Sequence, residues 1–271
     1  LKCKLDELGY RLSIHDNHVD SYRSSEFFNS LDHLTDREGE MVGGSQWGGG
    51  ATYRICMKNA PSAKSVLDMK RLKELGVNGI SYLDNMPSPV FTCHDPRHPC
   101  SRRDYVMGVR RLARAAADIS GCSSAEGYQD YALDDLDMPW KVHAPLPGMV
   151  SYFDQVPMID ELVPFFQTAY HGLRLYHTEY GYVYPENIAG PELELALGAL
   201  PMNEVQERSA WYIPAWRNCR SLMKRHHELV NGLHADRQSV FIDSIVIEDG
   251  KIFTRYADGI HFEFNLHKNS E

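Results

Sequence analysis

The sequence lacks several features that would assign its chemistry at once. No apolar run approaches about 18 residues, so a membrane-spanning helix is not expected. There is no long run of lysine and arginine, and the formal net charge of -9 argues against a surface that binds nucleic-acid phosphates. The Gly-rich stretch at residues 43–50 does not end in the Gly-Lys-Ser or Gly-Lys-Thr of a phosphate-binding loop. We therefore expect no membrane span, no nucleic-acid partner and no nucleotide at that loop.

Cysteine is scattered and sparse. The six cysteines include no C-x-x-C pair, so neither a zinc ribbon nor a thioredoxin motif is present. Cys93 and Cys100 could close a loop in an exported protein, but free thiols are the expected state. This scatter favours a reducing compartment, and the cytoplasm over secretion.

A chain of 271 residues can bury a large core, as one big domain or as one domain with an appendage. It begins without Met, and residues 2–8 are typical of the end of a helix whose start is missing. We expect the sequence to be a piece of a longer protein, with any targeting signal outside it.

The most informative pattern lies at residues 65–85. Apolar residues at helical spacing end at Gly76, and a short apolar run from Gly79 to Leu83 follows, with Asp84 directly after it. Such a run is typical of a parallel strand covered on both faces. Because ligands and catalytic groups gather at the carboxyl ends of parallel strands, Asp84 is a candidate catalytic group. The alternative is that Asp84 caps the following turn.

The same order of helix, strand and polar strand end recurs downstream. Ser101 is the predicted N-cap of a helix from Arg102 to about Ile119, and residues 122–125 predict a strand that leads to Glu126. Asp84 and Glu126 lie 42 positions apart, a length that suits one βα repeat with a long loop. Upstream, residues 10–14 predict a strand whose end carries His15, Asp16 and Asn17.

Residues 19–50 are too polar and Gly-rich for a core element, so we predict a long loop, which in a compact domain is usually functional. Trp47 lies among the glycines of this segment. A flat aromatic side chain on a mobile loop is a good platform for a sugar ring. The alternative is that Trp47 folds down over the core as a plug.

The remaining elements complete the predicted architecture. We expect strands at 52–57, 148–153 and 173–176, and helices at 159–170, 192–200 and 204–233. From residue 239 the apolar period changes to two, which with turns at Asp249-Gly250 and Asp258-Gly259 predicts antiparallel hairpins. The fold class is therefore α/β: an incomplete (β/α)8 TIM-type barrel over residues 1–235, then the start of an antiparallel β domain, a β-sandwich, over residues 236–271.

Two carboxylates at neighbouring strand ends suit the cleavage of glycosidic bonds. One attacks or stabilises the oxocarbenium-like centre, and the other, held protonated, donates to the leaving oxygen. A separation of about 5 Å favours retention of configuration, and about 6.5–9.5 Å favours inversion.

Five short motifs add to this interpretation by their order along the chain. They are His-Asp-Asn at 15–17, Tyr-Leu-Asp at 82–84, Asp-Pro-Arg-His-Pro at 95–99, Ser-x-Glu-Gly at 124–127 and Tyr-His-Gly at 170–172. Together they resemble the barrel of the α-N-acetylgalactosaminidase relatives in glycoside hydrolase families 101 and 129, and a related group of uncharacterised bacterial proteins. The resemblance covers most of residues 5–235, and the later hairpins resemble the β domain that follows the barrel there. The chain lacks the first barrel strands and the N-terminal β domain of that pattern.

The resemblance implies a retaining α-glycosidase, with α-N-acetylgalactosaminide or a related α-galactoside as substrate. Asp84 would be the nucleophile and Glu126 the acid/base. The partner would be a carbohydrate or glycoconjugate, and no cofactor or catalytic metal would be required, although a structural calcium remains possible.

The residues that would contact the substrate come from several motifs. His15, Asp16 and Asn17 would line the glycone pocket. Trp47 and Tyr82 would offer faces to the sugar. Arg97 and His98 would hold the carboxylates or the substrate hydroxyls, and His171 would be a further binding residue.

Two rival functions remain open. A metal-dependent barrel hydrolase would use histidines with carboxylates as ligands. The histidines on or near predicted strand ends are His15, His18, His94, His98 and His171. A non-catalytic carbohydrate-binding protein would use Asp84 and Glu126 only as caps. The discriminating observation is whether both carboxylates point into one open pocket.

Overall fold

The computed structural model of the chain divides into two compact units, residues 1–139 and 140–271, and each is treated by itself. The structure describes residues 1–84, 86, 89–127, 129–140, 142, 163–178, 190–200, 224–225, 227–229, 232 and 235–265. No described helix is long and apolar enough to cross a membrane.

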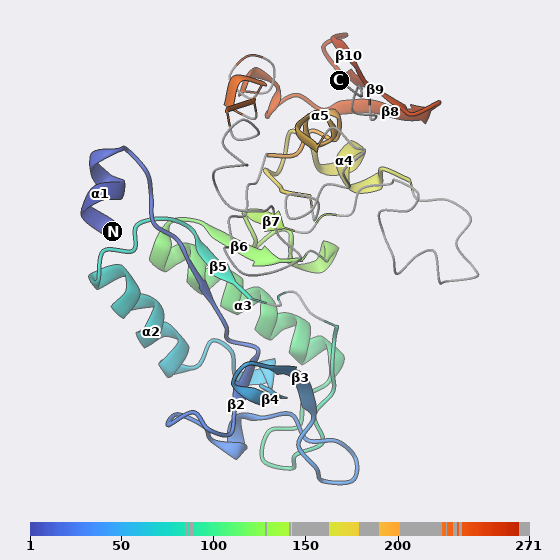
Figure 1. The fold of residues 1–271 in the computed structure, drawn as a ribbon. Coiled ribbons are helices and arrows are strands. Elements are labelled where there is room, and N and C mark those ends of the chain that lie inside the picture. The colour runs from blue at the N-terminus through green and yellow to red at the C-terminus, as the bar shows by residue number, and fades with distance from the viewer. Residues whose placement is uncertain are drawn as a thin grey trace. The chain divides into compact units, whose positions relative to one another are not determined.

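The first unit is built on a sheet whose strand order is β1-β5-β6-β7 (Figure 1). The strands are β1 (Ile14–Asp16), β5 (Ser81–Leu83), β6 (Ser123–Glu126) and β7 (Met138–Trp140). Pairing is parallel between β1 and β5 and between β5 and β6. The helices α1 (Lys2–Glu7), α2 (Ala63–Glu74) and α3 (Arg102–Ser120) precede β1, β5 and β6. The predicted α/β class with parallel strands is therefore confirmed.

Helix α3 packs along β5 and β6 and supplies most of the core on that side (Figure 1). It begins at Ser101, whose hydroxyl and the carboxylate of Asp104 form a capping box, and it ends at Gly121 in the left-handed region. One face of the helix is buried against Leu83 and Ala125 of the strands. The buried side chains of α3 include Tyr105, Val109, Leu112, Ala113 and Ala116.

Residues 19–50 are not one long loop, so that prediction is wrong. They contain β2 (Asp20–Tyr22) and β3 (Gly43–Trp47), which pair antiparallel with β4 (Gly50–Arg54) in the order β2-β4-β3. The strands escaped detection because they bury polar groups: the Thr52 hydroxyl donates to Asp20 Oδ2 (3.2 Å) and both residues are buried. Three short 3-10 helices complete the unit: η1 (Ser30–Asp32), η2 (Met57–Asn59) and η3 (Asp130–Ala132).

The second unit ends in the predicted hairpins. The strands β8 (Ile242–Glu248), β9 (Lys251–Tyr256) and β10 (His261–Asn265) pair antiparallel in the order β10-β9-β8. The first turn holds Asp249 and Gly250 at φ 49° and 72°, which is the conformation of a tight hairpin turn. Apolar side chains of this sheet share a core with Leu193 and Leu197. The domain boundary near residue 236 stays a prediction.

Other expectations in the second unit have mixed outcomes. The helices α4 (Phe165–Tyr170) and α5 (Gly190–Ala196) confirm parts of two predicted helices, and η6 (Ala235–Arg237) precedes the hairpins. The strand predicted at 173–176 is wrong, since the bridge in this region joins Thr178 to Val142 instead. The strand predicted at 148–153 and most of the helix predicted at 204–233 lie outside the described residues.

Candidate active site

The parallel register places two rows of side chains on one face of the sheet. The first row consists of His15, Tyr82 and Ser124, which are paired across β1, β5 and β6. Side chains alternate along a strand, so the next row on that face lies two positions further on. It consists of Asn17, Asp84 and Glu126. The ladder continues to this level, since the Asp84 amide donates to the Asp16 carbonyl (2.8 Å).

Three side chains contact the Asp84 carboxylate. Asn17 Nδ2 donates to Asp84 Oδ2 (2.9 Å), and His15 Nε2 lies 3.0 Å from Asp84 Oδ1. A side-chain hydrogen bond joins Asp84 to Glu126. Burial works to raise the pKa of Asp84, but the contacts with His15, Glu126 and Asn17 outweigh it and lower the pKa to about 2. Asp84 is therefore ionised throughout the neutral and mildly acidic range.

Glu126 lies beside the same imidazole. His15 Nε2 is 3.9 Å from Glu126 Oε2, and the ligand atoms of His15, Asp84 and Glu126 all lie within 4.8 Å of one another. The side chains of Asp84 and Glu126 are 27% and 21% exposed. The two predicted catalytic carboxylates thus converge on one face of the sheet and reach its surface.

Asn17 is held in one orientation by the backbone. Its Oδ1 accepts from the amides of Val19 (2.9 Å) and Asp20 (3.1 Å), so its Nδ2 is left to donate to Asp84 and to Asp20 Oδ1 (3.0 Å). Sequence reasoning missed Asp20, a buried partner of this amide. Asn17 forms an Asx turn, in which Oδ1 accepts from the amide two residues on, but that pattern does not identify Asp20 as a partner of Nδ2.

A cavity of about 250 Å³ lies in the first unit, and Asn17 and His18 are among its lining residues. Asn17 therefore lines the cavity and also contacts the carboxylate cluster, because its side-chain amide donates to Asp84.

Asp16 is not part of the carboxylate cluster. It pairs with Leu83, whose side chain is in the core, so its own side chain lies on the other face of the sheet from His15. There His18 Nε2 lies 2.9 Å from Asp16 Oδ2. Burial opposes ionisation, but the contacts with His18 win and lower the pKa of Asp16. Adjacent residues of the His-Asp-Asn motif therefore serve opposite faces.

Two aromatic residues predicted to face a sugar have different settings. Tyr82 packs edge-on against His15, with ring centroids 4.5 Å apart and planes at 77°. Trp47 ends β3 at the β3–β4 turn and is 65% exposed. The alternative that Trp47 plugs the core is wrong. Its role as a platform stays a prediction.

Arg97 and His98 make their resolved contacts away from Asp84 and Glu126. Arg97 binds Asp95 through its Nε (2.8 Å), its Nη2 and its backbone amide (2.9 Å). These hydrogen bonds lower the pKa of Asp95. His98 is buried beside Asp95 and Cys93. The expectation that this pair holds the catalytic carboxylates is corrected, because Asp95 takes the guanidinium first.

His171 belongs to the core of the second unit. It is 1% exposed, its Nδ1 lies 2.7 Å from the Val240 carbonyl, and its ring packs edge-on against Tyr176 and Tyr256. Burial lowers its pKa, which favours the neutral ring. The structure therefore gives His171 a packing role in place of the predicted contact with substrate.

The described residues form no metal site with several histidines. His15 is the histidine of the carboxylate cluster, whereas His18 contacts Asp16, and His94 Nε2 lies 3.5 Å from the Thr92 hydroxyl. One imidazole and two carboxylates within 4.8 Å still make a donor set that a divalent cation can use. The cluster is thus chemically compatible with either two-carboxylate or metal chemistry.

Comparison with known proteins supports the resemblance. No family model and no curated protein sequence matches the chain. It is similar to solved structures of α-N-acetylgalactosaminidase NagBb from Bifidobacterium bifidum. The ligand-free form has a TM-score of 0.75 at 16% identity, covering 96% of this chain and 41% of that one. The Gal-NHAc-DNJ complex has a TM-score of 0.76 at 18% identity, covering 97% and 42%. These values establish a shared fold, and this chain spans about two fifths of the length of those proteins.

Proposed function

We propose that the protein is a retaining α-glycosidase that acts on an α-N-acetylgalactosaminide or a related α-galactoside, with its parallel sheet as part of a (β/α)8 barrel. The observation that carries the proposal is the convergence of Asp84 and Glu126 at the carboxyl ends of adjacent parallel strands. The fold shared with a protein named α-N-acetylgalactosaminidase supports the same reaction class.

Asp84 takes the role of nucleophile. Its pKa of about 2 keeps the carboxylate ionised, and Asn17 and His15 hold one oxygen each. Retaining enzymes place their two carboxyl groups about 5–5.5 Å apart, and inverting enzymes about 6.5–9.5 Å apart. Ligand atoms of Asp84 and Glu126 within 4.8 Å favour the shorter separation of the retaining geometry.

Glu126 takes the role of acid and then base. In this proposal Glu126 carries the proton, while the low pKa of Asp84 keeps that carboxylate ionised. Glu126 then protonates the glycosidic oxygen as Asp84 attacks the anomeric carbon, and it deprotonates water in the second step. His15, in reach of both groups, orients them relative to each other.

The second candidate is a metal-dependent hydrolase. The donor set of His15, Asp84 and Glu126 favours it, since a divalent cation held there would activate water. A non-catalytic carbohydrate-binding protein is the third candidate, and it predicts binding without turnover.

The test is hydrolysis of aryl α-glycosides by full-length protein, led by α-N-acetylgalactosaminide. Asp84→Asn should remove turnover for every leaving group, with a loss of at least about 100-fold, because no covalent intermediate forms. Glu126→Gln should cost more with a poor leaving group such as phenol than with 4-nitrophenol, because acid assistance matters more there. Asp134→Asn is the matched control, since Asp134 is an 82% exposed carboxylate.

Each outcome separates the candidates. A loss below about tenfold in Asp84→Asn contradicts the nucleophile assignment. Wild-type activity that disappears with a chelator and returns when a divalent cation is restored favours the metal hydrolase, because Asp84 and Glu126 would then be ligands of the cation. Sugar binding with no hydrolysis across the panel favours the binding protein.

A further inference from the structure

A second cluster of metal-ligating side chains lies in the core of the first unit. It consists of Cys56, Cys93, His98 and Cys100, each between 3% and 8% exposed. The ligand atoms of the first three lie within 4.8 Å of one another. Cys100 lies beside Cys56 but is not among the ligand atoms within 4.8 Å, and its thiol donates to the Ser101 carbonyl (3.4 Å). Two sulfurs and one imidazole are thus gathered with little exposure to solvent, with a third thiol next to them, and Cys56 and His98 also line the cavity.

The backbone positions these ligands independently of any ion. Cys93 and Cys100 face each other across an antiparallel bridge, with reciprocal N···O distances of 2.9 and 3.0 Å. Between them the chain turns at Asp95, whose carbonyl accepts from the His98 amide (3.1 Å). Cys56, at the start of η2, donates its amide to the Asp32 carbonyl (2.8 Å). A preformed set of ligands reduces the cost of ordering them around a cation.

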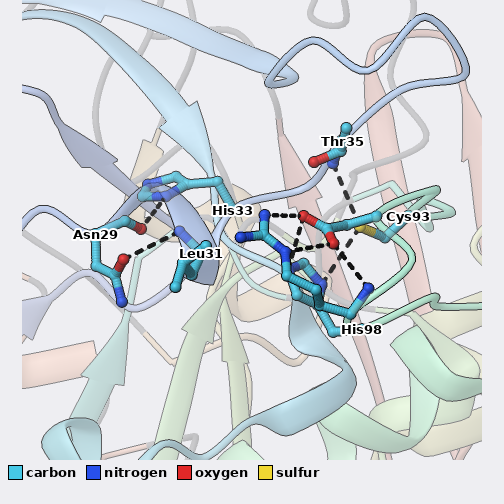
Figure 2. A network of polar contacts seen from close by, with 8 residues as sticks. Asn29, Leu31, His33, Thr35, Cys93 and His98 are labelled. Carbon is cyan, nitrogen blue, oxygen red and sulfur yellow. Dashed lines mark hydrogen bonds and ion pairs between the residues drawn. The ribbon is translucent and has the colours of Figure 1, made fainter.

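The surroundings of the cluster are those of a metal-binding thiolate site. The Thr35 amide donates to Cys93 Sγ (3.3 Å), and His98 Nδ1 lies 3.5 Å from the same sulfur (Figure 2). The other ring nitrogen, Nε2, lies 3.5 Å from Asp95 Oδ2. Metal-ligating histidines usually have a carboxylate beside their second ring nitrogen; Asp95 takes that place near His98, without a formed hydrogen bond. Arg97 in turn holds Asp95, so this pair acts as support for the imidazole.

We propose that Cys56, Cys93 and His98 bind one structural zinc ion, with Cys100 as the fourth ligand once its thiol turns from the Ser101 carbonyl. Three thiolates and one imidazole are a common structural zinc set, and four protein ligands fill its tetrahedral coordination. Because these four ligands fill the coordination of the ion, it stabilises the fold and takes no part in chemistry, although Cys56 and His98 also line the cavity. The proposal is independent of the glycosidase assignment, because the carboxylate cluster shares no residue with it.

A disulfide or a reactive thiol fits the cluster less well. Reactive thiols are accessible, whereas Cys56, Cys93 and Cys100 are only 3–6% exposed, and all three are free thiols in the structure. The sequence also carries no C-x-x-C pair. Cys93 and Cys100 are seven positions apart and meet across the bridge, and Cys56 comes from a distant segment.

The test is the zinc content of full-length protein, purified without chelator and dialysed against metal-free buffer. Elemental mass spectrometry should find one zinc ion per protein chain. Replacement by Co²⁺ should give thiolate-to-cobalt charge transfer and the strong visible bands of a tetrahedral site. Cys93→Ser and His98→Ala should lower the zinc content, whereas Cys122→Ser, at a cysteine outside the cluster, should leave it unchanged.

The wild-type protein alone can overturn the proposal if the variants fail to fold. Folded wild-type protein that holds no zinc after growth with added zinc contradicts it, and so does iron in its place. A Cys93–Cys100 disulfide in peptides mapped without reduction contradicts it as well. Protection of the thiols of Cys56, Cys93 and Cys100 from alkylation should disappear after zinc is removed, and the melting temperature should fall. Neither readout depends on glycosidase activity.

Discussion

Asp84 shows how neighbouring donors can outweigh burial at a single residue. Burial alone would raise its pKa, yet contacts with His15, Glu126 and Asn17 bring the pKa from 3.8 to about 2. A carboxyl group whose folded pKa is depressed stabilises the folded state above its unfolded pKa. That contribution is lost as the pH falls from about 4 to about 2. The Asp84 carboxylate should therefore stay ionised across any physiological pH.

Removal of the His15 contact should raise the pKa of Asp84. In His15→Ala the acidic limb of the kcat/KM profile should move to higher pH, because the limb reports the nucleophile of the free enzyme. The measurement is kcat/KM against pH with the best aryl glycoside. His94→Ala is the control, since His94 is an exposed histidine whose resolved contact is with Thr92. An unchanged limb in His15→Ala would refute the coupling.

At this scale the sequence predicted residue types better than their directions. Asp84, Glu126, His15 and Asn17 were chosen from motifs at strand ends, and they lie together. Asp16 sits between two of them in sequence but faces away, because a strand alternates its side chains. His171 depends on a distant partner, Val240, that no local pattern reveals, whereas the partner of Arg97, Asp95, lies two positions away in the same motif.

Among the elements, α3 depends on one close approach. A Cβ on Gly108 would overlap the carbonyl oxygen of Met57 in η2, a backbone atom that cannot rotate away. Glycine to alanine in a helix normally stabilises by about 1 kcal/mol. Here the sign reverses, and Gly108→Ala should destabilise the protein by at least about 2 kcal/mol because α3 and η2 must separate.

Urea unfolding followed by circular dichroism measures this change. Gly48→Ala is the control, because a Cβ there meets no atom within 4 Å and the backbone is not in the left-handed region. Equal stability of the two variants would contradict the close packing of α3 on η2.

Elements with strong local signals were predictable. The capping box and the terminal glycine of α3, the apolar β5, and the hairpin turns at Asp249-Gly250 and Asp258-Gly259 all match the structure. The strands β2 and β3 were missed because they have no apolar alternation and are defined by pairing with β4. Pairing partners far along the chain are not visible in a local window.

For the whole molecule, the proposed reaction has a definite stereochemical outcome. The first product released from an α-glycoside should be the α-anomer, because two displacements at one carbon restore its configuration. Proton NMR during the first minutes of hydrolysis distinguishes the two anomers before mutarotation. An initial β-anomer would exclude Asp84 as a covalent nucleophile.

The α/β class followed from repeated helix-to-strand units, and the fold shared with NagBb agrees with it. The cluster of Cys56, Cys93 and His98 could not be predicted in the same way. Its ligands come from two segments, around Cys56 and from Cys93 to Cys100, and only the packing of η2 beside α3 and the bridge brings them together. Long-range packing of this kind is a property of the folded unit.

The rows formed by the parallel register have a consequence for relatives of this chain. Asp84 and Glu126 meet because each lies two positions beyond a paired residue, Tyr82 and Ser124, and the number of residues between the strands does not enter. The connection from β5 to α3 can therefore lengthen or shorten during evolution without separating the carboxylates. A single insertion within β5 itself would turn Asp84 toward the helices and disconnect the pair. In divergent homologues, the position of each acid within its strand should be preserved while the interval of 42 residues drifts.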